Sequence, residues 1–280
     1  MSNFVQRTLS GAVYVALVVC SIIFFEQCPW LFGVLFIVVS IWALTEYHTL
    51  AGSSFLTKMA GAVLSGWLFL TAFASTLPMD TLCVNDRLIC VNDRLNIGVY
   101  CLLLIVALVA QLFRQGINAR SEWADLLTGQ VMIALPFALS CLIVGYDKLI
   151  LLALYVIIWV NDTGAYCTGS LIGKHKMFPR VSPGKTWEGL AGGVLFSLIA
   201  GYLFARLSGS ETMTTGMWIC LSAVIAAAGT LGDLMESLMK RTIGVKDSGS
   251  FLPGHGGVLD RFDSFLLACP SVCLVLWLIL

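Results

Sequence analysis

The chain has 280 residues, of which 59% are hydrophobic and only 11% are charged, and its mean hydropathy is +0.92. Soluble globular proteins carry roughly 25% charged residues, so this composition excludes a water-soluble surface and indicates an integral membrane protein. The formal net charge of zero argues against a nucleic-acid partner, which selects a basic surface.

The apolar runs predict an all-α, polytopic membrane protein with about nine transmembrane helices. A membrane-spanning helix needs about 20 mostly apolar residues. Runs near that length lie at residues 9–25, 30–47, 59–77, 97–113, 126–146, 149–167, 187–207, 213–232 and 264–280. We interpret the first run as a retained span and not as a signal peptide, because no small-residue cleavage pattern follows it.

The distribution of Lys and Arg predicts the orientation of these spans. If the N-terminus is cytoplasmic, most basic residues fall on the cytoplasmic side. The cytoplasmic residues are Arg7, Lys58, Arg114, Arg120, Lys174, Lys176, Arg180, Lys185, Lys240, Arg241, Lys246 and Arg261, and the others are Arg87, Arg94, Lys148 and Arg206. Because cytoplasmic loops are enriched in Lys and Arg, we expect a multi-pass protein of the cell (inner) membrane with a cytoplasmic N-terminus.

We expect two functional regions. Residues 1–150 form a scaffold of spans available for lipid or dimer contacts, and in it Glu46 and His48 are interpreted as interfacial polar residues. The heptads CVNDRLI and CVNDRLN at 83–96 indicate a local duplication in a solvated loop. Residues 151–280 form the catalytic region, with long cytoplasmic loops at 168–186 and 233–263.

Carboxylates from four spans of the second region are expected at one depth, the cytoplasmic boundary of the bilayer. Acidic side chains at that depth are unfavourable unless they are paired or bind a metal, which makes them candidates for function. Each could instead cap a helix in the headgroup region, an alternative that is weaker for the whole set than for any one residue. The set is Asp162, Glu188, Asp233, Glu236, Asp260 and Asp263.

The spacing of these acids predicts a magnesium site. Asp233, Glu236 and Lys240 follow one another at i, i+3 and i+7, and Asp260 and Asp263 are one helical turn apart. Oxygen ligands from two helices, without His or Cys in ligand spacing, are typical of Mg²⁺.

The same segments carry groups that bind phosphate. Glycines on both sides of His255 let backbone N–H groups converge on an anion, and five basic side chains surround the acids. These basic residues are Lys185, Lys240, Arg241, Lys246 and Arg261. The GKT of SPGKTWEG is not a P-loop, because Pro179 replaces the required Gly and no strand is expected before it. We therefore expect a polyphosphate site at the membrane surface, with a lipid as second substrate.

Residues 237–263, SLMKRTIGVKDSGSFLPGHGGVLDRFD, resemble the signature of phosphatidate cytidylyltransferases, also called CDP-diacylglycerol synthases. The segments NDTGAY at 161–166 and SPGKTWEG at 182–189 are similar to that family as well, whereas the first 150 residues carry no matching motif. The resemblance implies transfer of the cytidylyl group of CTP to phosphatidate, giving CDP-diacylglycerol and pyrophosphate. It also implies Mg²⁺ with K⁺ as a second cation, an all-helical membrane fold and a homodimer.

For this reaction we assign a role to each candidate residue. Asp233 and Asp260 are the principal metal ligands and catalytic residues, because they lie on the helices that bracket the signature. Asp263, Glu236 and Asp162 are further metal or orienting groups, Lys240 is catalytic, and His255 is a phosphate donor or an acid–base group. The substrate-binding residues are Ser182, Lys185, Ser237, Arg241, Lys246, Asp247, Gly256, Gly257 and Arg261.

Two alternative functions share some of these features. A cation-coupled transporter also uses membrane acids, but it would place them near the bilayer midplane and in two related halves. A CTP-dependent transferase acting on another lipid phosphate or a lipid alcohol would need nearly the same loop chemistry, and the sequence leaves it open. A purely structural scaffold gives no reason to concentrate charges and glycines in one loop.

Overall fold

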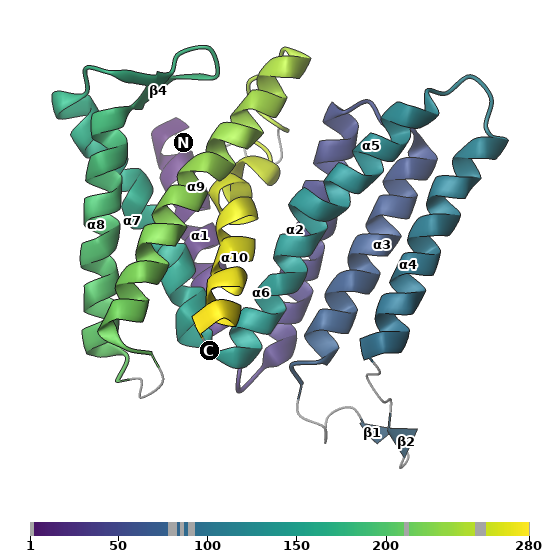
Figure 1. The fold of residues 1–280 in the computed structure, drawn as a ribbon, viewed down its shortest axis with the longest axis horizontal. Coiled ribbons are helices and arrows are strands. Elements are labelled where there is room, and N and C mark those ends of the chain that lie inside the picture. Colours follow the sequence, from purple (N-terminus) through teal and green to yellow (C-terminus); the bar gives the residue numbers. More distant parts are fainter. Residues whose placement is uncertain are drawn as a thin grey trace. The chain divides into compact units, whose positions relative to one another are not determined.

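A computed structural model describes residues 3–77, 83–84, 87–88, 93–209, 213–249 and 256–279, and most of these residues are helical (Figure 1). The described residues form two compact units. The first unit comes from the ranges Met1–Lys148 and Asp247–Leu259, and the second from Leu149–Lys246 and Asp260–Leu280. Part of the 233–263 loop, assigned from the sequence to the C-terminal region, therefore packs with N-terminal helices.

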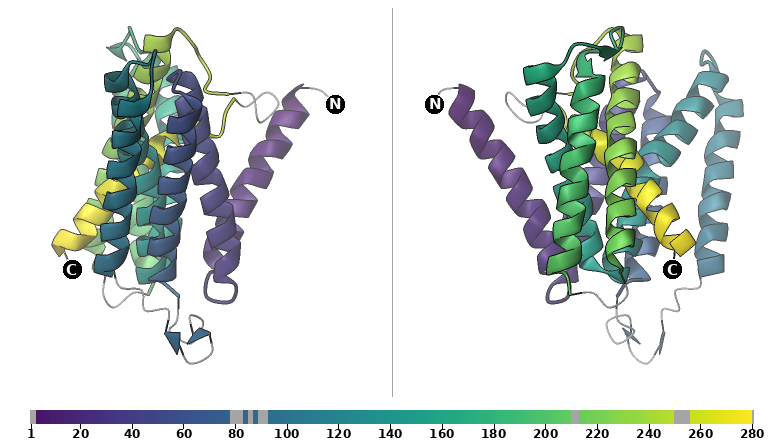
Figure 2. Two further views of the ribbon diagram at one scale, coloured as in Figure 1. Left: turned by 90° about the vertical axis from the view of Figure 1, so that its right-hand side faces the viewer. Right: turned by 60° about the vertical axis from the view of Figure 1, so that its left-hand side comes forward.

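The first unit contains helices that follow one another in the chain. They are α1 (Asn3–Ile23), α2 (Pro29–Leu50), α3 (Phe55–Ala74), α4 (Asp93–Ala110), the 3-10 turn η2 (Gln111–Phe113), α5 (Ala119–Gly129), the π-helical segment η3 (Gln130–Ala134) and α6 (Leu135–Tyr146). Figure 2 shows α1 leaning away from α2 beyond the short turn that joins them. The 83–96 repeat, expected to be a loop, contributes the paired strands β1 (Cys83–Val84) and β2 (Arg87–Leu88) and the start of α4.

Aromatic rings fill the interior of the first unit. Phe32 and Phe36 of α2 stack with their ring centroids 4.0 Å apart, and Phe36 meets Phe137 of α6 edge-on at 6.3 Å. Gly33 of α2 leaves room for Phe73 of α3, because a Cβ at Gly33 would lie 2.7 Å from that ring. These contacts hold α2, α3 and α6 together by burial of apolar area.

A buried carboxylate joins α5 to the start of α3. Glu122 accepts hydrogen bonds from the backbone N and Oγ of Ser54, at 3.1 and 2.9 Å, and from the Thr57 hydroxyl. Ser54 is the N-cap of α3, so this charge lies at the positive end of the helix dipole. The wider π-helical turn of η3 then precedes Pro136, which has no backbone N–H to donate.

The second unit contains four long helices and one hairpin. They are α7 (Lys148–Ile172, with Leu149 as its first residue in this unit), β3 (Lys176–Phe178), β4 (Ser182–Thr186), α8 (Trp187–Leu207), α9 (Thr215–Ile243) and α10 (Leu259–Ile279). Strands β3 and β4 pair antiparallel, with Lys176 opposite Thr186. The expectation that no strand precedes GKT is therefore wrong. The polar sequence of this hairpin lacks the alternation of apolar residues that signals a strand.

Small residues let the helices of the second unit approach closely. A Cβ at Gly192 of α8 would overlap the Thr168 side chain of α7, and one at Gly201 would overlap Ser222 of α9. A Cβ at Gly232 of α9 would lie 2.7 Å from the Asp263 carbonyl oxygen of α10. Close backbone packing of this kind is how membrane helices associate.

The structure confirms the predicted all-α, polytopic membrane class. Within the described residues, eight helical segments are long and apolar enough to cross a membrane: Pro29–Leu50, Phe55–Ala74, Leu95–Phe113, Ala119–Tyr146, Lys148–Ile172, Trp187–Leu207, Thr215–Ile243 and Leu259–Ile279. Helix α1 adds the shorter apolar stretch Gly11–Ile23. Helix α9 continues about three turns beyond the expected end at residue 232, until Gly244 stops it with φ +81°. Much of the expected 233–263 loop is thus helical.

Candidate active site

The β3–β4 hairpin carries the first candidate residues, Ser182 and Lys185, on β4. Glu188, in the first turn of α8, accepts hydrogen bonds from the backbone N–H of Lys174 and of His175, both at 3.1 Å. Its Oε1 also lies 2.5 Å from Nδ1 of His175. Glu188, which the sequence groups with the acids at the membrane boundary, thus closes the base of the hairpin.

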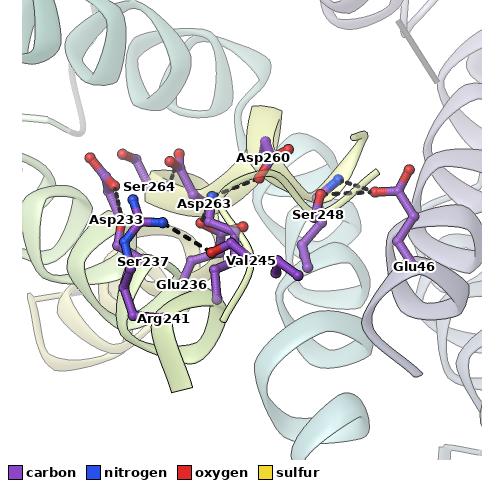
Figure 3. Close-up of polar contacts among 12 residues, drawn as sticks. Glu46, Asp233, Glu236, Ser237, Arg241, Val245, Ser248, Asp260, Asp263 and Ser264 are labelled. Carbon is purple, nitrogen blue, oxygen red and sulfur yellow. Dashed lines mark hydrogen bonds and ion pairs between the residues drawn. The ribbon is translucent and has the colours of Figure 1, made fainter. Parts of the chain in front are cut away.

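Lys185 forms an ion pair with Asp233 of α9. Its Nζ lies 2.6 Å from Asp233 Oδ2 and 3.3 Å from the carbonyl oxygen of Thr230, to which it donates. The Ser237 hydroxyl donates to Asp233 Oδ1 at 3.2 Å, one turn further along α9 (Figure 3). Both oxygens of Asp233 are therefore engaged, and the hairpin is tied to α9 by a charged contact.

Two more carboxylates, Asp162 of α7 and Asp263 of α10, lie close to Asp233. All three repel one another, and Lys185 attracts both Asp162 and Asp263 in addition to its ion pair with Asp233. Asn161 donates to Asp162, and the backbone N of Ser264 donates to Asp263 Oδ1 at 2.5 Å. We call Asp162, Asp233 and Asp263 the carboxylate cluster. Its ionised form carries two more negative charges than Lys185 can neutralise.

A cavity of about 490 Å³ opens beside the carboxylate cluster. This volume lies within the range of about 300–1,000 Å³ typical of small-molecule sites. The hairpin, α7, α8 and α9 contribute its walls, and Asp162, Lys185 and Asp233 line it. Ser182, Tyr166, Ser170, Lys176 and Thr230 are among the other lining residues. A ligand in this cavity would meet both signs of charge and several hydroxyl groups.

A second charged group lies along α9 and at the start of α10. Lys240 Nζ is 2.5 Å from Glu236 Oε2 and 2.7 Å from Asp260 Oδ1. The side chains of Lys240 and Asp260 are only 10% and 11% exposed, and that of Glu236 is 2% exposed. Because burial of a charge is tolerated only with close partners, Lys240 depends on both carboxylates and they depend on it.

The predicted metal residues therefore fall into two groups. Asp233 pairs with Lys185, which also attracts Asp162 and Asp263, whereas Glu236 and Asp260 pair with Lys240. Asp233 and Asp260, expected to act as the principal pair of ligands, form ion pairs with different lysines. Among the described residues, no three acidic, His or Cys side chains are already arranged to hold a metal ion. The oxygen-only donors and excess negative charge of the carboxylate cluster nevertheless suit a hard divalent cation.

The other candidates belong to the signature segment. Arg241 donates from Nη1 to the Val245 carbonyl oxygen at 3.0 Å, which closes the end of α9 (Figure 3). Lys246 and Asp247 are exposed and available to a ligand. Gly256 has φ +78°, Gly257 is buried, and Arg261 lies in the first turn of α10. His255 falls outside the described residues, so its predicted role stays a prediction.

Sequence reasoning missed several residues around the cavity. Thr230 supplies a carbonyl oxygen to Lys185, and Tyr166 and Lys176 line the cavity. Tyr166 belongs to the NDTGAY segment that resembles the family, and Lys176 is one of the basic residues expected on the cytoplasmic side. Both signals were present in the sequence, but neither says which way a side chain points.

Comparison with known proteins places the chain among enzymes that handle CTP. A profile described as "Cytidylyltransferase family" matches residues 5–279. A phosphatidate cytidylyltransferase of Haemophilus influenzae is 30% identical over 288 aligned residues, which cover 95% of this chain and 96% of that protein.

Two further relatives with that name match a shorter stretch more strongly. The Staphylococcus epidermidis protein is 47% identical over 122 residues, covering 44% of this chain and 46% of its own length. The Staphylococcus aureus protein is 46% identical over 124 residues, with the same two coverages. Because the profile extends over nearly the whole sequence, the chain belongs to the cytidylyltransferase family.

Proposed function

We propose that the chain transfers the cytidylyl group of CTP to phosphatidate, giving CDP-diacylglycerol and pyrophosphate. Family membership supports the use of CTP, and the name of the Haemophilus relative supports phosphatidate as acceptor. The observation that carries the proposal is the ion pair of Lys185 with Asp233 beside one cavity of a membrane-spanning chain, with Asp162 and Asp263 near enough to be attracted by the same lysine.

The reaction joins two anions. A phosphate oxygen of phosphatidate forms a bond to the α-phosphorus of CTP, and the bond between that phosphorus and the oxygen bridging to the β-phosphate breaks. Pyrophosphate leaves with the electron pair of that bond. The attacking phosphate is already deprotonated near neutral pH, so positioning and charge neutralisation are what the protein must supply.

The chain's own residues supply positive charge at defined places. Lys185 presents its ammonium group to the cavity from β4, and Ser182 on the same strand offers a hydroxyl group. Lys240, Arg241, Lys246 and Arg261 are further phosphate-binding groups in this proposal. Glu236 and Asp260 hold the Lys240 ammonium group, and Ser237 orients Asp233.

Mg²⁺ is the cofactor in this proposal. The carboxylate cluster would hold it, and Asp260 on α10 and Glu236 on α9 are further oxygen donors in this proposal. When bound, Mg²⁺ neutralises phosphate oxygens and so reduces the repulsion between the two substrates. A second, monovalent cation such as K⁺ follows only from the family resemblance and belongs to the proposal on that ground.

The membrane setting completes the proposal. We place the N-terminus and the reaction on the cytoplasmic side of the cell (inner) membrane, where CTP is available, because Lys and Arg are concentrated in the loops of that side. Phosphatidate reaches the site from the bilayer. A homodimer is the assembly that the family resemblance implies.

The test is a product assay with purified protein in detergent or lipid nanodiscs. Pyrophosphate release and CDP-diacylglycerol formation are measured with CTP, phosphatidate and Mg²⁺ present, and with each omitted in turn. We expect both products only in the complete mixture. A lipid panel containing diacylglycerol and an isoprenoid phosphate checks the acceptor. If one of these lipids gives a cytidylylated product and phosphatidate gives none, that lipid and not phosphatidate is the acceptor. If no lipid gives a product, the proposed transferase activity is refuted.

A further inference from the structure

Two lysines from paired strands line the cavity of the second unit, and they differ in their partners. Lys185 of β4 lies 2.6 Å from Asp233 and also attracts Asp162 and Asp263. Lys176 of β3 lines the same cavity, but its ammonium group forms no ion pair and no hydrogen bond with the described residues. The cavity therefore contains one lysine whose charge the protein itself uses and one whose charge is left for a ligand.

The sequence around Lys176 supplies no negative charge to compensate it. From residue 163 to residue 187 the chain contains no Asp or Glu, although it carries three lysines and one arginine. Lys176 is exposed, and the hydroxyl-bearing residues Tyr166, Ser170 and Ser182 line the cavity with it. A phosphate group accepts strong hydrogen bonds from an ammonium group and weaker ones from hydroxyl groups. An ammonium group among hydroxyl groups, without a carboxylate partner, therefore fits a phosphate.

Apolar side chains on both sides of the hairpin indicate its depth in the membrane. The hairpin joins the end of α7 to the start of α8, and both helices are long and apolar enough to span a bilayer (Figure 1). Leu171 and Ile172 at the end of α7 are exposed, as is Trp187, the first residue of α8. Trp is enriched at the level of the lipid headgroups. Lys176, in the hairpin between these residues, is thus presented at headgroup depth.

We propose that Lys176 binds the phosphate of the anionic lipid acceptor, which is phosphatidate in the proposed reaction. The acyl chains of this lipid hold its phosphate in the headgroup layer, whereas CTP approaches from water. Lys185 and the carboxylate cluster then remain for CTP and its cation, so each of the two anions meets a separate lysine. The identity of the lipid rests on the proposed function, whereas the free ammonium group rests on the contacts alone.

A lysine that binds only the lipid predicts a selective change in kinetics. Lys176→Gln removes the charge at similar side-chain length. We expect the KM for phosphatidate, measured as its surface fraction in mixed micelles, to rise about tenfold. The KM for CTP and kcat should stay within about twofold of wild type, because an interaction made equally in the ground state and the transition state affects only KM. A raised KM for CTP with an unchanged KM for phosphatidate would assign Lys176 to the nucleotide and overturn the proposal.

Two further variants separate a binding site from a general attraction to anionic lipid. Lys176→Arg keeps a phosphate-binding charge and should hold the KM for phosphatidate within about threefold of wild type. Lys174→Gln is the matched control, because Lys174 is exposed on the same loop but does not line the cavity. We expect wild-type kinetics from it. An equal rise in the KM for phosphatidate in Lys174→Gln and Lys176→Gln would show that the whole hairpin attracts the membrane surface, and would overturn the assignment to Lys176.

Equilibrium binding tests the site without reference to turnover. The binding of phosphatidate to the full chain in detergent, without CTP, is compared with the binding of diacylglycerol, which lacks the phosphate. In Lys176→Gln the Kd for phosphatidate should rise about tenfold relative to wild type and Lys174→Gln, and the Kd for diacylglycerol should not change. Equal Kd values for phosphatidate in all three proteins overturn the proposal. If wild-type protein makes no CDP-diacylglycerol, the proposed function fails, while the Kd values still decide whether Lys176 binds a lipid phosphate.

Discussion

The Nζ atom of Lys185 lies 2.6 Å from Oδ2 of Asp233, so that the hairpin between α7 and α8 is joined by an ion pair to α9. The same ammonium group is the nearby cation for Asp162 and Asp263. A single lysine on a short hairpin is therefore the counter-charge for carboxylates from three helices. Its loss should affect both substrate binding and the balance of charge beside the cavity.

Lys185→Ala should lower kcat/KM for CTP by about 100- to 1,000-fold, the range for removal of one preorganised charged donor. The loss follows because no other side chain shown in contact with Asp233 supplies a positive charge. Steady-state assays of pyrophosphate release measure it. Lys174→Ala is the control, since Lys174 is exposed and only its backbone N–H contacts Glu188. Equal kinetics for the two variants would exclude the hairpin from the site.

Asp260→Asn should abolish turnover while the protein stays folded in detergent. The fold survives because Glu236 still pairs with Lys240 at 2.5 Å. The double variant Glu236→Gln with Asp260→Asn leaves the buried ammonium group without an anionic partner, and should lower the free energy of unfolding by about 3–5 kcal/mol. Thermal unfolding and activity measurements on wild type, Asp260→Asn and the double variant distinguish a loss of turnover from a loss of stability. Near-normal turnover by Asp260→Asn would remove Asp260 from the catalytic residues.

Removal of one carboxylate from the cluster should weaken the binding of Mg²⁺ in a measurable way. We expect no activity in excess chelator and recovery when Mg²⁺ is restored. In Asp263→Asn the Mg²⁺ concentration for half-maximal activity should rise about tenfold or more, because one oxygen donor has lost its charge. Glu26→Gln, with the same type of change at an exposed site, should keep the wild-type value. An identical Mg²⁺ curve for Asp263→Asn would argue that the ion binds elsewhere.

Close packing of α8 on α9 should make Gly201 intolerant of even a methyl group. A Cβ there would overlap the Ser222 side chain and lie 2.9 Å from the Trp218 carbonyl oxygen. Gly201→Ala should therefore lower the free energy of unfolding by about 1–3 kcal/mol. The matched control is Gly98→Ala in α4, where nothing lies within 4 Å of the added atom and the better helix propensity of Ala should help. Thermal unfolding of both variants gives the answer, and equal stability would contradict the packing argument.

The membrane spans could be predicted from the sequence because an apolar run of fixed length has few alternatives in a bilayer. The end of α9 could not. Its last turns contain Asp233, Glu236 and Lys240, and hydropathy alone ends a span where charges begin. The helix continues because these charges find partners, until Gly244 in the left-handed conformation ends it.

The spacing of residues along α9 predicted which side chains share a face of the helix. It did not predict which side chain each of them contacts. Three residues turn a helix by about 300°, so Asp233 and Glu236 differ in direction by about 60°. That difference is enough for Asp233 to meet Lys185 of the hairpin while Glu236 meets Lys240 on its own helix. The sequence also could not predict that Glu46 accepts hydrogen bonds from Ser248, Val258 and Leu259, because these residues are 202, 212 and 213 positions away in the chain.

The π-helical segment η3 determines the rotational phase between α5 and α6. One extra residue in a turn rotates everything beyond it by about 100°. Glu122 of α5 contacts Ser54, and Phe137 of α6 contacts Phe36. In a regular helix from Ala119 to Tyr146, the two side chains would be rotated relative to each other by about 100° from their present directions, so only one of the two contacts could form. The inserted residue lets one continuous span satisfy a polar neighbour near one membrane surface and an aromatic neighbour in the interior. Deleting a single residue from 130–134 would force the chain to give up one of the two.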